Sequence, residues 1–304
     1  MDEWLYLLLR FVHYVLLLGL FGLTAFGAVG LRGVMPRQPV RAYSASIVLA
    51  AIAPLVSTAL LLVSIAAMMG QPLQSVDGDV IKAIVTTTDI GSAFVIRLAL
   101  LVAALVAMLG RRRFPAMVLV AAIFYAGVLM TLPWNGHAAA AEGGIGLLHR
   151  LNDGLHLLAA GFWIGAIGWF AVLSALAHRG DDAIDSGALL TALHRFRSLG
   201  IALVAVVALT GTLNAELIFG LANSEEVLAT AYGRLLIVKI ALVGLMLLCA
   251  AGHSSMVREQ VTAADGRGAL PLAGLHKSLM VELVLAVAIA AVVAALGLTS
   301  PNSS

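Results

Sequence analysis

The sequence predicts an all-α membrane protein, a bundle of eight transmembrane helices with both termini on the outer side. Three observations lead to this fold class. Hydrophobic residues make up 62% of the 304 residues and charged residues only 11%, whereas a soluble domain carries about 25% charged residues. The mean hydropathy is +1.04 over the whole chain. The apolar residues form long runs, and most charged residues lie between these runs.

Eight apolar runs are long enough to cross a bilayer, since a transmembrane helix needs about 20 mostly apolar residues. The segments between the runs are too short for a soluble domain, so we expect residues 1–304 to form a single integral membrane domain. In chain order the predicted helices are 4–31, 43–69, 90–109, 115–132, 148–177, 197–220, 232–252 and 277–298.

Basic residues alternate between loops and give the predicted orientation. The second and sixth loops are acidic, with Asp77 and Asp79 in one and Glu225 and Glu226 in the other. By the positive-inside rule the odd-numbered loops are cytoplasmic, so the termini and the even-numbered loops face outward. The basic residues of the odd-numbered loops are Arg32, Arg37, Arg41, Arg111, Arg112, Arg113, Arg179, Arg195, Arg197, Arg258, Arg267 and Lys277.

Several classes of function are excluded by composition. The net charge of +2 is spread over separate loops, so we expect no nucleic-acid partner. The single cysteine, Cys249, lies in an apolar run, which excludes disulfides and thiolate metal clusters. No ATP-binding motif is present, which excludes direct ATP-driven pumping.

The stretch "GHAAAAEGGIGLLHRLNDGLHLLAAGFW" (136–163) carries the candidate site. At about 100° per residue, His149, Asp153 and His156 fall within about 60° on one helix face. Imidazole and carboxylate groups bind metals, and imidazole suits copper, zinc, iron or nickel. His149 and His156 are about 10 Å apart along the axis, so they cannot both bind one ion. Asp153 lies one turn from each and can join either.

Two further histidines are candidate ligands. His13 is predicted at a depth similar to that of His156, counted from the outer face, and His137 in the flexible "NGHAAAAEGG" loop can close the site. Met130 offers a thioether if the ion is Cu(I). Ionisable groups at membrane depth are costly and usually mark a site or a pathway, which favours a metal site over residues that merely line the interface.

Other polar residues inside the runs receive structural interpretations. Arg10 either pairs with Asp153 or Glu142 or extends toward the outer interface, and Arg97 is expected to extend outward in the same way. Asn214 and Glu216 are interpreted as capping or interface residues at the outer end of the sixth run, with the lining of an entry path as the alternative. Gly161 and Gly165 form a small-xxx-small pattern, which lets helices approach closely.

Several motifs together resemble the copper resistance protein D family (CopD and PcoD). They are "GHAA", "LNDGLHLLAAGFWIGAIG", "RFRSLGIALVAVVALTGTLNAELIF", "TAYGRLLIVKIALVGLMLL" and "KSLMVELVLAVAIAAVVAALGLTSP". The resemblance is strongest over 134–170 and 195–301. One departure is "AAGHSSMV", where the family commonly has an Asn-Arg pair.

The resemblance implies a multi-pass protein of the bacterial inner membrane, with periplasmic termini and a role in copper homeostasis. It implies a transport protein rather than an enzyme. This protein would take up copper, as Cu(II) or Cu(I), from the periplasm across the lipid bilayer. It also implies a small periplasmic copper carrier (CopC-like) as a separate partner. The family's outward histidine-rich region falls on His137, His149, Asp153 and His156.

Two alternatives stay open at this point. Histidines in membrane bundles also ligate haem, so a b-type electron-transfer protein with His13 and His156 as axial ligands fits the same residues. A metal sensor or receptor that transports nothing fits them as well.

Overall fold

The computed structural model describes residues 3–31, 40–135, 143–179, 186–262 and 272–301. Within these residues all regular elements are helical, and eight helices are long and apolar enough to span a membrane. Both findings confirm the predicted all-α class and the eight predicted membrane spans. The spanning helices are α1 (Glu3–Val29), α2 (Val40–Met68), α4 (Asp89–Gly110), α5 (Met117–Met130) with the following 3-10 turn η2 (Leu132–Asn135), α6 (Gly143–His178), α7 (Ser186–Phe219), α9 (Ala231–Thr262) and α10 (Leu272–Leu296).

The eight predicted runs each coincide with one of these helices, but the bounds of several differ. α10 begins at Leu272 rather than at 277, and α9 continues to Thr262 rather than ending at 252. α6 begins at Gly143 rather than at 148, and α7 begins at Ser186 rather than at 197. The added turns of α7 are too polar to count as a membrane run, yet Leu189 and Leu193 are buried there, so packing extends the helix.

Two short helices occur in loops where none was expected. α3 (Gly78–Thr87) follows α2, and α8 (Ser224–Ala229) follows α7. The side chain of Asp77 caps α3 by accepting a hydrogen bond of 2.9 Å from the backbone N–H of Asp79. Such a cap satisfies an N–H group that the first helical turn leaves without a partner.

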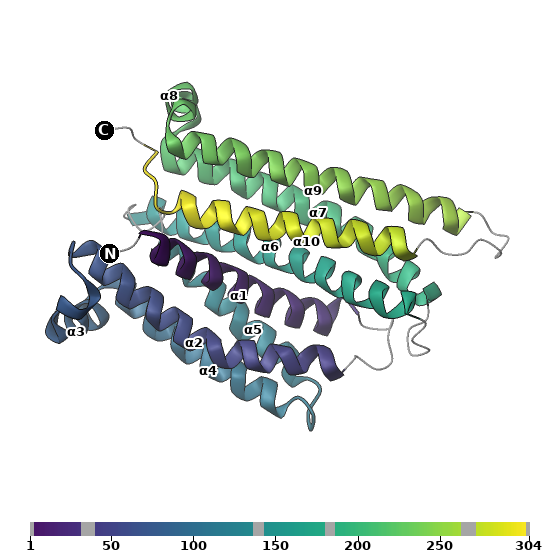
Figure 1. Cartoon of the computed structure of the whole chain (residues 1–304), viewed down its shortest axis with the longest axis horizontal. Helices are drawn as coiled ribbons and strands as arrows, with labels where there is room; N and C mark the ends of the chain where they lie inside the picture. Colours follow the sequence, from purple (N-terminus) through teal and green to yellow (C-terminus); the bar gives the residue numbers. More distant parts are fainter. Residues whose placement is uncertain (1–2, 32–39, 136–142, 180–185, 263–271, 302–304) are drawn as a thin grey trace.

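Both termini lie at the same end of the bundle, together with α3 and α8 (Figure 1). We call this the termini end. The turn between α4 and α5 lies at the opposite end (Figure 1). An even number of spanning helices requires this arrangement, since each crossing reverses the direction of the chain.

α6 is the central helix of the bundle and packs against α1, α5, α7 and α10. Its crossing with α1 is close because glycines face each other: a Cβ on Gly22 of α1 would meet the backbone of Gly161 and Gly165. The predicted small-xxx-small contact is thereby confirmed, with α1 as the partner. Near this crossing, Trp169 Nε1 donates a 2.7 Å hydrogen bond to the carbonyl oxygen of Leu23.

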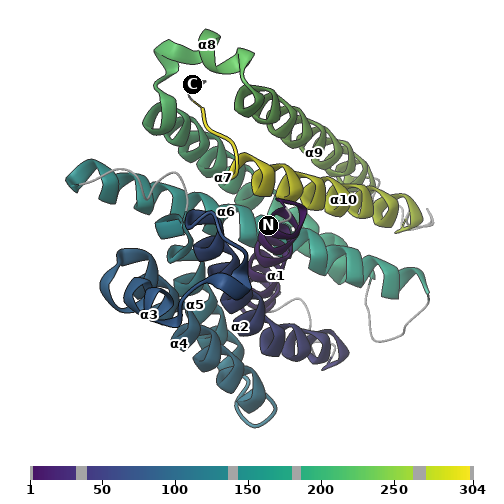
Figure 2. The ribbon, with the colours of Figure 1, turned by 60° about the vertical axis from the view of Figure 1, so that its left-hand side comes forward.

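α7 and α9 form the edge of the bundle beside α6 and α10 (Figure 2). Few residues of these two spans are buried within the chain, which is expected of helices that face lipid. Polar side chains on them are therefore costly unless they turn toward the bundle, and the candidate site contains such residues.

Candidate functional site

The polar face of α6 begins about one and a half turns from the start of the helix. His149 and Asn152 are buried, and Asp153 and His156 are half-buried. The 3.6-residue period places all four on one face. Because α6 is the central helix, this face is held in position by the close α1–α6 crossing on another side of the helix.

A chain of amide hydrogen bonds joins this face to α7. Asn152 Nδ2 donates to Asn214 Oδ1 and to the carbonyl oxygen of Thr210, each at 2.8 Å. Asn214 Nδ2 in turn donates to Asp153 Oδ1 at 3.0 Å. The Asn214 amide is therefore one of the groups that orient the Asp153 carboxylate.

His156 contacts α7 through a hydrogen bond to Thr210, and the other contacts of Thr210 indicate the tautomer of the histidine. Its Nδ1 lies 2.9 Å from Thr210 Oγ1. The Thr210 hydroxyl has one proton, and its 2.6 Å contact with the carbonyl oxygen of Val206 uses that proton. The hydroxyl oxygen must then accept from His156 Nδ1–H, so Nε2 carries the lone pair. This is the arrangement of a metal-binding histidine whose second nitrogen is bonded to an outer group.

α9 contributes charge to the same region. Lys239 interacts electrostatically with both Asp153 and His156, and Tyr232 interacts with Asp153. The ammonium group balances the carboxylate when no metal is present and opposes the arrival of a cation.

Met130 approaches the site region from α5. A Cβ on Gly154 would collide with Met130 Sδ, so the glycine makes room for the thioether. Gly154 lies about 100° around the helix from Asp153. The thioether is therefore next to the polar face of α6 but on a different side of it.

His13 occupies a different environment, on the side of α1 that faces α2 and α4. Its Nε2 lies 2.8 Å from Ser57 Oγ of α2, and Arg10 and Arg97 both interact with it electrostatically. His13 and His156 thus hydrogen bond to different helices, α2 and α7. Tyr14 lies between the two regions, since it interacts electrostatically with both arginines and with Asp153.

The structure brings Asp153 and His156 together against α7 and places His149 one turn away on the same face. His137 and Glu142 lie outside the described residues. Among the described residues, no group of three or more His, Cys, Asp and Glu side chains is arranged to hold a metal ion. A complete ligand set therefore needs atoms beyond Asp153 and His156.

The sequence interpretation missed the polar residues that surround these side chains. Asn152, Thr210 and Asn214 orient the histidine and the carboxylate, yet they were not among the predicted site residues. Of the roles considered for Asn214, its bonds to Asn152 and Asp153 do not fit that of a helix cap. The spacing of Thr210 and Asn214, four residues apart on one helix face, was the available signal.

Glu216 Oε2 accepts a 2.8 Å hydrogen bond from the N–H of Leu221, the first residue of η4, so Glu216 ties the end of α7 to the turn that follows it. The expectation for Arg97 was wrong. Its side chain is buried rather than extended outward, and it donates to Thr131 Oγ1, the Thr131 carbonyl oxygen and Asn135 Oδ1 at 2.6–3.0 Å. Acceptors on Thr131, at the end of α5, and on Asn135 of η2 replace the water that an outward-pointing guanidinium would have reached.

Comparison with known proteins agrees with this architecture over the length of the chain. Residues 1–147 match the family described as "Copper resistance protein D-like, N-terminal domain", and residues 190–296 match "Copper resistance protein D". Copper resistance protein D of Pseudomonas syringae pv. tomato is 34% identical over 315 residues, an alignment that covers 99% of this chain and 98% of that protein. The chain belongs to the copper resistance protein D family.

Two further relatives align with shorter parts of this family member. Inner membrane protein YebZ of Escherichia coli (strain K12) is 28% identical over 269 residues, with 86% of this chain and 87% of YebZ covered. Copper transport protein CutJ of Bacillus subtilis (strain 168) is 32% identical over 139 residues, 45% of this chain but only 24% of CutJ. No solved structure matches the chain. The protein is thus a multi-pass protein of the bacterial inner membrane.

Proposed function

We propose that this protein imports copper across the inner membrane and captures it at the α6 face that carries His149, Asp153 and His156. The observation that carries the proposal is the tautomer of His156. Thr210 accepts from Nδ1–H, which leaves the Nε2 lone pair for a metal. Asp153, fixed by Asn214, supplies a carboxylate one turn away.

The orientation in the membrane supports capture from the periplasm. The termini end carries the acidic residues of the short helices α3 and α8, including Asp79, Glu225 and Glu226. The opposite end carries Arg112 and Arg113 between α4 and α5. By the positive-inside rule the termini end faces the periplasm, and His149 then lies about 9 Å along α6 from its periplasmic start.

The proposed route is a ladder rather than one closed site. His149, with His137 from the preceding loop, would receive copper at the periplasmic end, and Asp153 would pass it toward His156. Nitrogen and carboxylate ligands suit Cu(II), and Met130 is near enough to the polar face to assist Cu(I). A small periplasmic carrier (CopC-like) is the proposed copper donor at this end.

His13 was expected to complete the site, and that expectation stays a prediction. Its surroundings oppose it on electrostatic grounds, since Arg10 and Arg97 act on His13 and would repel a copper ion bound there. We therefore place the copper ligands on α6 and treat His13 as a residue to be tested separately.

Copper binding to purified protein tests the site. We expect His156→Ala to weaken copper binding by about 100-fold, because it removes a ligand rather than an outer-shell partner, whose loss alone costs about 10–100-fold. His178→Ala, an exposed histidine at the other end of α6, is the matched control and should bind copper as the wild type does. Equal binding by both variants would refute the site, and a Soret band in the purified protein would favour the haem alternative.

Copper uptake into proteoliposomes tests transport separately from binding. The wild type should accumulate radioactive copper in vesicles whose exposed face is the termini end, and His156→Ala should not. Full copper binding without uptake in the wild type would show a sensor or receptor instead of a transporter.

A further inference from the structure

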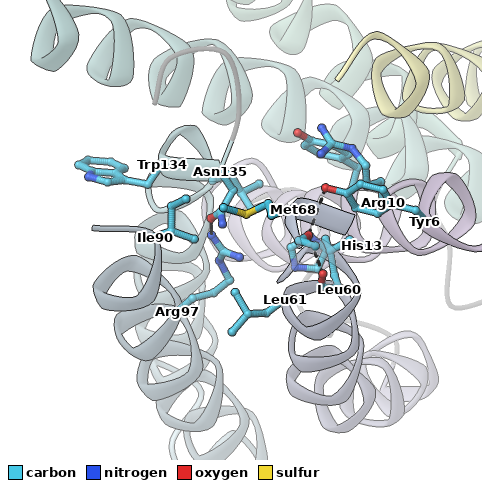
Figure 3. A pocket seen from close by; sticks show the side chains of 13 residues that line it. Tyr6, Arg10, His13, Leu60, Leu61, Met68, Ile90, Arg97, Trp134 and Asn135 are labelled. Carbon is cyan, nitrogen blue, oxygen red and sulfur yellow. Dashed lines mark hydrogen bonds between the residues drawn. The ribbon is translucent and has the colours of Figure 1, made fainter. Parts of the chain in front are cut away.

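A cavity of about 180 Å³ lies at the termini end between α1, α2, α4 and η2, on a different side of α1 from the copper ladder. Figure 3 shows Arg10 and Arg97 approaching it from separate helices. By the same measure of volume, a single water needs about 10–15 Å³, so the cavity holds a small polyatomic ion together with water. Its polar lining includes Tyr6, Arg10, His13, Arg97 and Asn135.

Two of the residues that line the cavity are buried arginines without a matching carboxylate among the described lining residues. Arg10 is 7% exposed and Arg97 is 3% exposed. Among the described residues that line the cavity there is no Asp or Glu. Burying a charge is costly unless an opposite charge balances it, and the cost is greater at membrane depth. The cavity is therefore set up for a negatively charged occupant.

The two arginines differ in how many of their donors are used. Arg97 donates through Nε and Nη2 to neutral oxygens of Thr131 and Asn135. These bonds fix the guanidinium and leave the N–H groups of Nη1 to donate to a ligand. Arg10 Nε is buried and has no hydrogen-bond partner among the described residues. The guanidinium of Arg10 lies 5.7 Å from the centre of the Tyr6 ring, which holds the group without using its N–H donors.

The form of these donors indicates the class of ligand. A guanidinium presents a planar fork of N–H groups that matches the oxygens of a phosphate or carboxylate. Arg10 is seven residues beyond the start of α1, about 10 Å along the helix axis. The headgroup layer is about 5–8 Å thick on each side of the bilayer, so this depth is just below it. Both a lipid phosphate and a dissolved anion can reach it.

We infer that this cavity is an oxyanion site in which Arg10 and Arg97 bind a phosphate group, either inorganic phosphate or the phosphate of an anionic phospholipid headgroup. The site is separate from the copper ladder and does not depend on it. The N-terminal half of the bundle would thus bind an anion, whereas the proposed copper site binds a cation.

Isothermal titration of the full chain in detergent with sodium phosphate, against sodium chloride at equal ionic strength, tests the free-anion source. We expect saturable phosphate binding that is weakened about tenfold or more in Arg10→Gln, because a charge-assisted pair is lost. Arg113→Gln, an exposed arginine at the opposite end, is the matched control and should bind phosphate as the wild type does.

Native mass spectrometry after reconstitution in nanodiscs of equal phosphatidylcholine and phosphatidylglycerol tests the lipid source. The wild type and Arg113→Gln should retain phosphatidylglycerol, and Arg10→Gln should lose it. If phosphate and phosphatidylglycerol both bind Arg10→Gln as well as the wild type, or if neither binds the wild type, the inference is overturned.

A second variant guards against misfolding of Arg10→Gln. A Cβ on Gly297 of the segment after α10 would collide with the guanidinium of Arg10. Gly297→Ala should therefore displace that group and weaken binding of the same ligand while every charge is kept. Unchanged binding in Gly297→Ala, with Arg10→Gln unfolded, also counts against the site.

Discussion

Gly22 of α1 lies directly against the backbone of α6, so one added methyl group at this position tests how the two central helices pack. An ideal Cβ at Gly22 would be 2.9 Å from both Cα and N of Gly165 and closer still to the carbonyl oxygen of Gly161. Ordinary Cβ contacts are 3.4–4 Å. The helices would have to move apart by at least 0.5 Å (3.4 minus 2.9), since backbone atoms cannot rotate away.

Gly19 provides a matched control on the same helix, because a Cβ there would have no atom within 4 Å. Both substitutions bring the same gain in helix propensity, about 0.5–1 kcal/mol. That gain cancels when Gly22→Ala is compared with Gly19→Ala. What remains is the cost of overpacking, about 1–3 kcal/mol, and we expect the upper part of this range because the obstructing atoms are backbone.

Thermal unfolding in detergent, followed by tryptophan fluorescence at one fixed scan rate, is the assay, since membrane proteins commonly unfold irreversibly. Gly22→Ala should unfold several degrees below Gly19→Ala. Gly19→Ala should unfold at or slightly above the temperature of the wild type. If the two variants unfold at the same temperature, the close α1–α6 crossing does not stabilise the bundle as argued.

Three further substitutions test the polar groups that support the site and the bundle. Asn214→Leu removes the amide that orients the α6 carboxylate, so copper affinity should fall by about 10–100-fold in competition with a chromophoric chelator; unchanged affinity would separate the amide chain from metal binding. Thr131→Val deprives Arg97 of one acceptor and should lower the free energy of unfolding by about 1–3 kcal/mol, whereas the exposed Thr212→Val should leave the unfolding temperature unchanged. Lys239→Met removes a cation that opposes the metal, so copper should bind roughly tenfold more tightly, and weaker binding would contradict the proposed role of the lysine.

The eight membrane spans were predictable because the hydropathy of a segment depends only on its own residues. In the bilayer every backbone N–H and C=O must be bonded within its own helix, so a long apolar run such as 90–109 identifies a span without knowledge of its neighbours. The polar face of α6 was predictable for the same reason, since helix geometry alone places His149, Asp153 and His156 on one side.

The partners of that face were not predictable from local pattern. Asn214 looks like a residue that ends a helix, and only the packing of α7 against α6 turns its amide toward Asp153. Arg97 looks like a residue that extends to water, and only the packing of α4 against the end of α5 and η2 supplies its three acceptors, two on Thr131 and one on Asn135.

By itself, then, the sequence determined the all-α class, the eight spans and the residues that share one face of a helix, because these depend on hydrophobicity and on the helical period. The tertiary structure decided which helices face each other. It set Thr210 against His156, and it placed His13 beside Ser57 of α2, near Arg10 and Arg97. Side-chain chemistry in a membrane bundle depends on contacts between helices, and a single sequence does not show directly which helices are in contact.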